Sequence, residues 1–315
     1  MAETLADLAE QSSDRFEGGV LKKFARQSNI LDRIPVVKTD SDIYKYRQQE
    51  TLPGIQNRAV NQAYSESTGR LATRTEDLSI FGGEMFRDRA LGRFEKSGGD
   101  SIDWMAEQIS MKTMALGREV ERQIFEGDKL VNPLEMQGLR ARLTGNQAQL
   151  AGSGGATITL AMVDALIDSV AMGTGKPYFY TSKAVRRKWT TLAKASGGSV
   201  SINYASVDKL GEQIAMYDGI PIEVVEDPWD AATILNAEDP GDGTADTYSI
   251  YLINFGVEEG VSLLVNGEGP LVQCYQVTKE TEQGPPGEKW RLETYIGMMR
   301  RHPRSAARLY GLLLA

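Results

Sequence analysis

The stretch SIDWMAEQISMKTMALGREVERQIFEGD, which runs from Ser101 to Asp128, decides the fold. Ser101 is suited to cap the first turn of a helix, and Gly127 is suited to end the last turn. Apolar residues recur at steps of three, four or seven, the spacing of one helical face, and they are Ile102, Met105, Ile109, Leu116, Val120 and Ile124. We therefore expect a helix over residues 101–126, about 38 Å long, that acts as a spine for the whole fold.

The segment before this helix, residues 44–79, is polar and rich in Thr, Gln, Asn and Arg. Tyr44 and Tyr46 alternate with basic residues, and Leu71 begins a second alternating run, which is the pattern of two strands around a polar middle. The pattern predicts a long hairpin that reaches about 40 Å. Because an isolated two-stranded hairpin is only marginally stable in water, we expect this one to need an external partner. A disordered loop is the alternative.

Residues 1–43 are interpreted as an arm made of short amphipathic pieces, with Pro35 stopping any helix. Two apolar stripes lie in it, and they comprise Leu5, Leu8 and Ala9, then Phe16, Val20, Leu21 and Phe24. These pieces have no obvious core of their own, so they must lie along the body of the same chain or along a neighbour. Our hypothesis is that the arm and residues 44–78 find their partners on adjacent copies of the chain.

A second domain is predicted after the spine helix, over residues 152–287. A joint rich in Gly, Ser and Ala (145–156) is interpreted as the linker into it. Beyond the linker, helical patterns alternate with strand patterns such as KPYFYTS and TYSIYLINF, which indicates an α/β domain around a sheet. The last stretch, 288–315, is interpreted as strands that return to the first domain, whose earlier part is 80–151.

Composition excludes several classes of function. The chain has 315 residues, a net charge of -8, one cysteine and one histidine, so it forms no intramolecular disulfide and no multi-histidine metal site. The acidic balance disfavours tight, sequence-independent binding to nucleic acid. Neither a signal peptide nor an apolar run long enough to cross a bilayer is present, so no membrane partner is expected.

The motif search yields no catalytic, cofactor-binding or metal-binding residue. GTGKPYFYTS is not a nucleotide phosphate loop, because Pro177 follows Lys176 and Val170 stands where the first glycine should be. It is interpreted as a turn and a strand. The spacing of four nearby acids does not match a calcium loop, so they are interpreted as a solvated loop; they are Glu238, Asp239, Asp242 and Asp246.

The single histidine, His302, stands in a basic cluster. Its neighbours are Arg300, Arg301, Arg304 and Arg308. We interpret the cluster as an edge strand whose charged face makes surface or intersubunit salt bridges, and weak contact with nucleic-acid phosphates is the alternative. Catalysis by His302 is not expected.

The single cysteine and the paired carboxylates are interpreted as structural rather than catalytic. Cys274, in an alternating strand, is expected to be a small apolar packing residue. The carboxylate pairs Glu226–Asp227 and Glu258–Glu259 come with no sign of a sugar cleft.

Three phrases, in their order along the chain, carry a resemblance to a known family: REVERQIFEGDKLVNPLEMQGL, GKPYFYTSKAVRRKW and GIPIEVVED. The chain resembles the major capsid proteins of tailed bacteriophages, with the HK-ninety-seven-type fold. The resemblance implies an α+β fold with an N-terminal arm (1–43), an extended loop (44–79), a peripheral domain with the spine helix (80–151 and 288–315) and an axial α/β domain (152–287).

The same resemblance implies a function. The chain would be a structural subunit, not an enzyme, and would assemble with copies of itself, as hexamers and pentamers, into an icosahedral head shell around double-stranded DNA. It would contact that DNA weakly and without specificity, would assemble in the host cytoplasm and would reside in the virion. Scaffolding, where needed, would come from a separate protein, and portal and decoration proteins would be further partners. No cofactor is implied.

Two alternatives stay open. An encapsulin-like nanocompartment shell shares the fold but encloses protein cargo. A hydrolase built on the α/β domain is the alternative of another class, and it would have to use His302 or Cys274.

Overall fold

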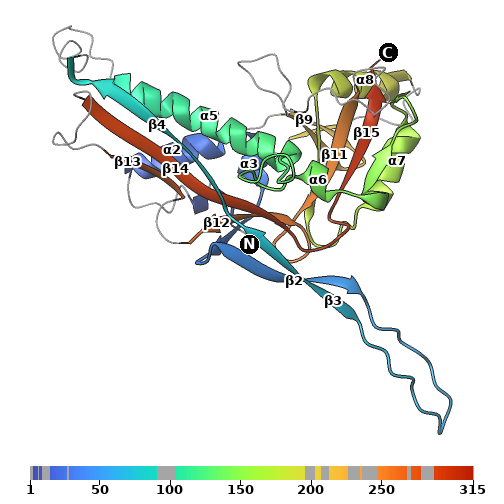
Figure 1. The fold of residues 1–315 in the computed structure, drawn as a ribbon. Helices are drawn as coiled ribbons and strands as arrows, with labels where there is room; N and C mark the ends of the chain where they lie inside the picture. The colour runs from blue at the N-terminus through green and yellow to red at the C-terminus, as the bar shows by residue number, and fades with distance from the viewer. Residues whose placement is uncertain are drawn as a thin grey trace.

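The molecule is a mixed α and β body from which one long hairpin projects (Figure 1). The computed structural model describes residues 3–5, 7–8, 15–26, 28–90, 104–195, 203–206, 213–225, 235, 247–267, 271–277 and 287–314. Within these ranges, no helix is both long enough and apolar enough to span a bilayer.

The spine is helix α5 (Trp104–Glu126), which lies along the strands β4 (Ser79–Asp88) and β14 (Gly287–Arg300) (Figure 1). Its predicted apolar stripe is buried, as shown by Met105, Ile109, Leu116, Val120 and Ile124. The helix ends at Gly127, where an added Cβ would lie 2.2 Å from the carbonyl oxygen of Met136. Residues 101–103 lie outside the described residues, and the rest of the predicted spine is confirmed.

Strands connect the whole body. In the described part of the chain they form a 13-stranded sheet whose main path runs β13-β14-β12-β11-β7-β10-β9-β8. Off this path, β1 pairs with β12, β4 with β14, and β15 with β11, β5 and β6. The remaining bounds are β1 Val36–Thr39, β5 Ala148–Leu150, β6 Ala156–Thr157, β7 Lys176–Thr181, β8 Asn203–Ser206, β9 Gln213–Tyr217, β10 Ile220–Val224, β11 Tyr248–Phe255, β12 Val261–Asn266, β13 Val272–Gln276 and β15 Ala306–Leu313.

Two hydrophobic clusters fill the body on either side of shared strands. The first contains α5, β4, β12 and β14. The second contains the helices α7 (Leu160–Ser169) and α8 (Lys183–Ala195), which cover β7, β10, β11 and β15. In the second cluster Trp189 is fully buried, with its ring edge-on to Phe179 at 5.1 Å between centroids. The predicted strand and helix over 176–195 are therefore confirmed.

The last two strands pair with different parts of the sheet, and the assignment of both to the first domain stays a prediction. β14 pairs with β4, β12 and β13, whereas β15 pairs with β11 on one side and with β5 and β6 on the other. Ala307, Leu309 and Leu312 of β15 are buried in the second cluster, whereas Ala306 of the same strand is buried in the first. The predicted linker 145–156 is likewise not a free joint, because β5 and β6 extend the sheet beside β15. The domain boundaries at 152 and 287 stay a prediction.

The arm lies on its own chain, so the hypothesis that it lacks a partner there is wrong. Helix α2 (Arg15–Ala25) packs against α5 and β13, and α3 (Asn29–Arg33) packs against α2 and α5. Its apolar side chains join the first cluster, and they are Leu5, Leu8, Val20, Leu21, Phe24, Ala25, Ile30, Leu31 and Ile34. These residues gather on helical faces, so docking on the spine removes their apolar surface from water.

Polar contacts fasten the end of the arm. The hydroxyl of Ser28 caps α3 by accepting from the N–H of Ile30 at 3.3 Å, and it donates to the carboxylate of Glu121 in α5. Arg33 forms a 2.8 Å ion pair with Glu223 of β10, and both side chains are largely buried. The arm thus bridges the spine helix and the strand of the GIPIEV sequence.

Candidate functional site

The hairpin projects from the body as the sequence pattern predicts. β2 (Ile43–Thr51) and β3 (Arg70–Asp77) run antiparallel, from the pair Ile43–Asp77 near the body to Thr51–Arg70 further out (Figure 1). In the described part of the chain these two strands pair only with each other. The predicted hairpin is confirmed, and the alternative of a disordered loop is wrong.

The outer part of the hairpin, residues 52–69, is the hairpin tip. It exposes large apolar side chains, including Leu52 (80%), Ile55 (92%), Val60 (88%) and Tyr64 (62%). The backbone of the tip is partly held in place, because the hydroxyl of Ser67 accepts from the N–H of Gly54 at 2.7 Å. Exposed apolar side chains that gather on one element mark an interaction site.

A second exposed apolar group lies in the loop 127–138, directly after the spine helix. Leu130, Val131 and Leu134 are 92%, 84% and 84% exposed. The loop is held rigidly, since Asp128 accepts from the N–H of Leu130 at 2.9 Å and Asn132 accepts from that of Leu134 at 3.2 Å. A rigid loop that presents three apolar side chains is a second candidate contact surface.

The root of the hairpin, where it joins the body, is packed and charged. Tyr46 packs on Leu264 and Met299, and its hydroxyl donates to the carbonyl oxygen of Arg300 at 3.1 Å. Burial, with the nearby Glu76 carboxylate, raises the pKa of Tyr46 above its ordinary value. The hairpin is therefore anchored at its root and uncovered at its tip.

Two ion pairs join the root to the segment that follows the spine helix. Both carboxylate oxygens of Glu76 contact the guanidinium of Arg142, one of them at 2.6 Å. Asp77 is paired with Lys129, and the hydrogen bond from Lys129 lowers the pKa of Asp77 below its ordinary value. A cavity of about 620 Å³ lies beside these pairs.

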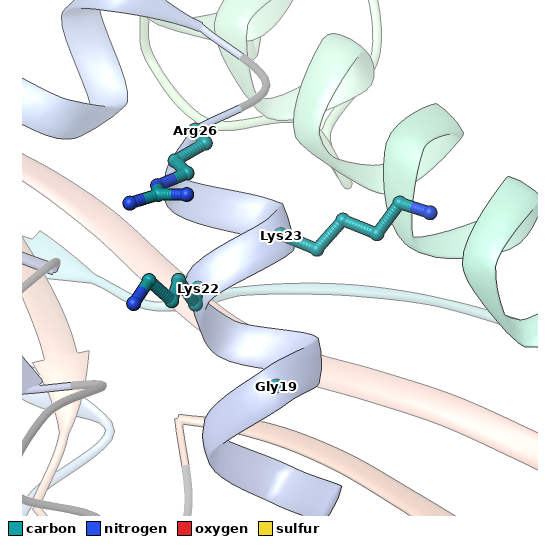
Figure 2. A pocket seen from close by; sticks show the side chains of 4 residues that line it. All are labelled: Gly19, Lys22, Lys23 and Arg26. Atoms are coloured by element: carbon teal, nitrogen blue, oxygen red, sulfur yellow. The ribbon is translucent and has the colours of Figure 1, made fainter.

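The outer face of α2 carries a small basic hollow of about 360 Å³, lined by Gly19, Lys22, Lys23 and Arg26. Figure 2 shows the side chains of Lys22 and Arg26 on one side of the helix, and that of Lys23 on the other side, toward α5. Lys23 donates to the hydroxyl of Ser110 in α5. A Cβ added at Gly19 would meet nothing within 4 Å, so the hollow is open beside Lys22 and Arg26.

No family model matches the chain, and no curated protein matches it by sequence. Solved structures do match across nearly the whole chain. The holo-SrpI encapsulin complex from Synechococcus elongatus has a TM-score of 0.65 and 13% identity, covering 91% of this chain and 88% of that one.

Two further matches come from particle shells. The capsid of a native GTA particle has a TM-score of 0.60 and 15% identity, covering 91% of each chain. The head of Helicobacter pylori bacteriophage KHP40 has a TM-score of 0.57 and 10% identity, covering 88% of this chain and 86% of that one.

The chain has the HK-ninety-seven-type capsid fold.

At these identities the likeness shows the fold, and it extends over about nine-tenths of the chain in each case. The predicted fold class, α+β of the capsid type, is therefore confirmed.

Within the capsid fold, the basic cluster around His302 is not an edge strand. Residues 301–305 form the turn between β14 and β15. Arg304 caps the end of α7, donating to the carbonyl oxygens of Asp168 and Ser169 at 2.8 and 3.0 Å. Arg308 is buried over the rings of Tyr251 and Tyr310. The arginines thus point into different parts of the body and do not form the single charged face that was expected.

His302 itself lies beside this turn, where its Nδ1 accepts from the N–H of Arg304 at 3.1 Å. Partial burial lowers its pKa, and the charges of Arg304 and Arg300 act in the same direction while Glu259 opposes them. Cys274 lies in β13 and packs against the first cluster, as expected, and burial raises the pKa of its thiol. The structure does not bring His302 and Cys274 together in one described pocket.

The other motifs are placed as follows. GTGKPYFYTS is a turn followed by β7, as predicted, with Gly173 in a left-handed conformation at φ +43°. Glu258 and Glu259 lie in the turn between β11 and β12. Glu226, Asp227, Glu238, Asp239, Asp242 and Asp246 lie outside the described residues. No group of three or more potential metal ligands occurs within the described ranges.

Sequence reasoning missed the exposed side chains of loop 127–138. The segment DKLVNPLEMQG belongs to the first of the three phrases that carry the resemblance, and no contact surface is predicted for it. A usable signal was present, because Leu130, Val131 and Leu134 lie between Asp, Asn and Pro residues that favour a turn and leave no regular face to bury.

Proposed function

We propose that the chain is a major capsid protein, a structural subunit whose copies assemble into an icosahedral head shell. The observation that carries the proposal is the hairpin, which is anchored at its root and exposes an apolar tip in a chain with the capsid fold. A segment of this kind gains a stable environment when it lies over a second copy. Repetition of one such contact by symmetry closes a particle from modest interfaces.

The loop 127–138 supports the same function from another side of the root. Its three exposed apolar residues are held in a fixed geometry, so little entropy is lost when they dock. Hexamers and pentamers are the assemblies we propose, with the hairpin tip and this loop both covered by neighbouring copies. The role is structural rather than catalytic, and the product resides in the virion after assembly in the host cytoplasm.

The proposed content of the shell is double-stranded DNA, held by weak and non-specific contact. The hollow on α2 offers Lys22 and Arg26, which form no ion pair among the described residues. Charge of this kind contacts phosphates without reading sequence, and a few such contacts on an acidic chain give weak binding. Separate scaffolding, portal and decoration proteins are the further partners that we propose.

One observation favours a second candidate function. The encapsulin complex, at a TM-score of 0.65, is as well matched as the capsids, so a shell around protein cargo is the alternative. The α/β hydrolase has no comparable support.

The test is electron microscopy of the purified full chain, followed by analysis of the particle contents. Closed icosahedral particles are expected. Nuclease-protected DNA in particles from the native source would support the head shell, and an enclosed protein without DNA would support the nanocompartment. A chain that stays monomeric at high concentration would refute both.

A further inference from the structure

The cavity at the hairpin root holds more positive than negative charge. It occupies about 620 Å³ between β3, the end of β14 and the segment after the spine helix. Four basic side chains line it, Arg74, Lys129, Arg142 and Arg300, against the two carboxylates of Glu76 and Asp77.

Two of these four cationic side chains form ion pairs with carboxylates. Arg142 is held by Glu76, and Lys129 by Asp77. Arg74 donates from Nε to the side-chain oxygen of Gln48 at 3.0 Å, which is a neutral acceptor. Two guanidinium groups, those of Arg74 and Arg300, therefore line the cavity without a carboxylate partner among the described residues.

Of these two guanidinium groups, that of Arg300 has the greater need of a hydrogen-bond acceptor. Its Nη1 atom is buried and has no hydrogen-bond partner among the described residues. Burial lowers the pKa of the Arg300 guanidinium, and repulsion from Arg142 and Arg74 adds to this effect, while attraction to Tyr46 and Glu76 opposes it. A buried donor on a charged group is costly when it is left unsatisfied, so an acceptor in the cavity would remove an existing cost.

From this arrangement we infer that the hairpin-root cavity binds an oxyanion, held by Arg300 and Arg74. The ligand is a tetrahedral inorganic anion of the phosphate type, or a carboxylate side chain inserted from a second copy of the chain. Both offer the planar guanidinium group two acceptor oxygens, the geometry in which Arg binds anions most strongly. Arg74, Thr73 and Thr75 are exposed on β3, so an anion can reach the cavity from solvent.

The position of the cavity at the hairpin root means that oxyanion binding would affect how the hairpin is held. Arg300 contributes the carbonyl oxygen that accepts from Tyr46, and Arg142 holds Glu76, so the oxyanion would sit among the contacts that fix the hairpin to the body. Its binding would tighten the root and hold the hairpin in one direction.

Inorganic phosphate is the probe, measured by isothermal titration calorimetry on the unassembled full chain at constant ionic strength. Wild type is expected to bind phosphate, and Arg300→Leu is expected to bind it about tenfold more weakly or worse. Arg70→Gln is the matched control. Arg70 lies on β3, the strand of Arg74, and pairs with Glu50 outside the cavity, so binding should be unchanged.

Arg74→Gln keeps the test decisive if Arg300→Leu does not fold, because Arg74 is exposed and its loss should weaken binding several-fold without unfolding the chain. Absence of phosphate binding by wild type, or equal binding by wild type and both cavity variants, would overturn the site.

An assembly assay distinguishes the two sources of the oxyanion, and this part of the test rests on the proposed function. If a carboxylate from a second copy is the ligand, phosphate should raise the protein concentration needed for assembly in wild type but not in Arg300→Leu. If a free anion is the ligand, assembled particles should bind phosphate as the unassembled chain does. Failure to assemble would refute the shell alone, because the calorimetry does not require particles.

Discussion

The arm and the hairpin tip give the same signal in the sequence and have opposite positions in the structure. Both are short runs with apolar residues and no core of their own. The arm buries its apolar residues on the spine of the same chain, with Phe24, Ile30 and Leu31 at 0% exposure. The tip leaves Ile55 at 92% and Val60 at 88% exposure.

Spacing explains the difference. Val20, Leu21 and Phe24 fall on one face of a helix, so a single docking step on α5 buries them together. Leu52, Ile55, Val60 and Tyr64 belong to no helix and lie beyond the paired strands, so no surface of the same chain can collect them. An amphipathic face is satisfied within the monomer, whereas apolar residues on an extended tip require a second molecule.

The largest expected effect comes from charging the tip. Ile55→Asp combined with Val60→Asp should abolish assembly, because two carboxylates would have to be desolvated under a neighbouring copy. The free energy of unfolding of the isolated chain should change by less than about 0.5 kcal/mol, since both residues are exposed. Sedimentation velocity measures the first and chemical denaturation the second.

Asn57→Asp is the control for that double variant, because it adds charge at the same tip without removing apolar surface. It should assemble nearly as wild type does. Normal particles from the double variant would show that the tip is not covered in the assembly, and the proposed role of the hairpin would be lost.

In contrast to the tip variant, a variant with a truncated buried side chain in the arm should destabilise the isolated chain. Phe24→Ala leaves a cavity against α5 and should lower the free energy of unfolding of the isolated chain by about 3–5 kcal/mol. Lys22→Ala, an exposed change in the same helix, should stay within about 0.5 kcal/mol. Guanidinium denaturation of the unassembled chain measures both. Equal stability of the two variants would mean that the arm docks only on a neighbour.

This contrast also marks what the sequence can predict. The periodicity of Met105, Ile109, Leu116 and Val120 predicts the spine, because a 3.6-residue repeat reports a local conformation. Alternation around Tyr44 and Tyr46 predicts the hairpin for the same reason. The resemblance then supplies the order of the elements, and the fold likeness bears it out.

What the sequence does not predict depends on distant partners. The pair Glu76–Arg142 joins residues 66 apart, and Arg33–Glu223 joins the arm to β10, so neither leaves a local pattern. The pairing of β15 with β11 is of the same kind, because it joins segments far apart in the chain, such as Ile253 with Ala306, and leaves no local pattern. The candidate oxyanion cavity depends on three such distant segments and has no local signature.

Removal of the Arg33–Glu223 ion pair at the end of the arm also tests the docking of the arm, with a smaller expected effect. Arg33→Met leaves the carboxylate of Glu223 in the interior without its guanidinium and should lower the free energy of unfolding by about 2–3 kcal/mol. Adding Glu223→Gln removes the buried charge and should restore part of that loss. A double variant no more stable than Arg33→Met would indicate that the charge of Glu223 is not the cause.

The smallest effect is expected at the root of the hairpin, where Asp77 pairs with Lys129. The hydrogen bond from Lys129 lowers the pKa of Asp77 below its ordinary value of 3.8. A carboxyl group with a lowered folded pKa stabilises the protein fully above its unfolded pKa and loses that contribution as the pH falls through the folded pKa. Because the Asp77 side chain is 60% exposed, solvent screening limits the gain to a few tenths of a kcal/mol.

The difference in stability between wild type and Asp77→Asn should therefore be constant near pH 6 and shrink as the pH is lowered below about 4. Thermal unfolding across this range measures it, with Asp42→Asn as the control for loss of an exposed carboxylate near the start of the hairpin. A difference for Asp77→Asn that does not change with pH would mean that the pair forms no charge-dependent contact. The root would then be held by Tyr46 packing and the Glu76–Arg142 pair, and the direction of the hairpin would be insensitive to acid in this range.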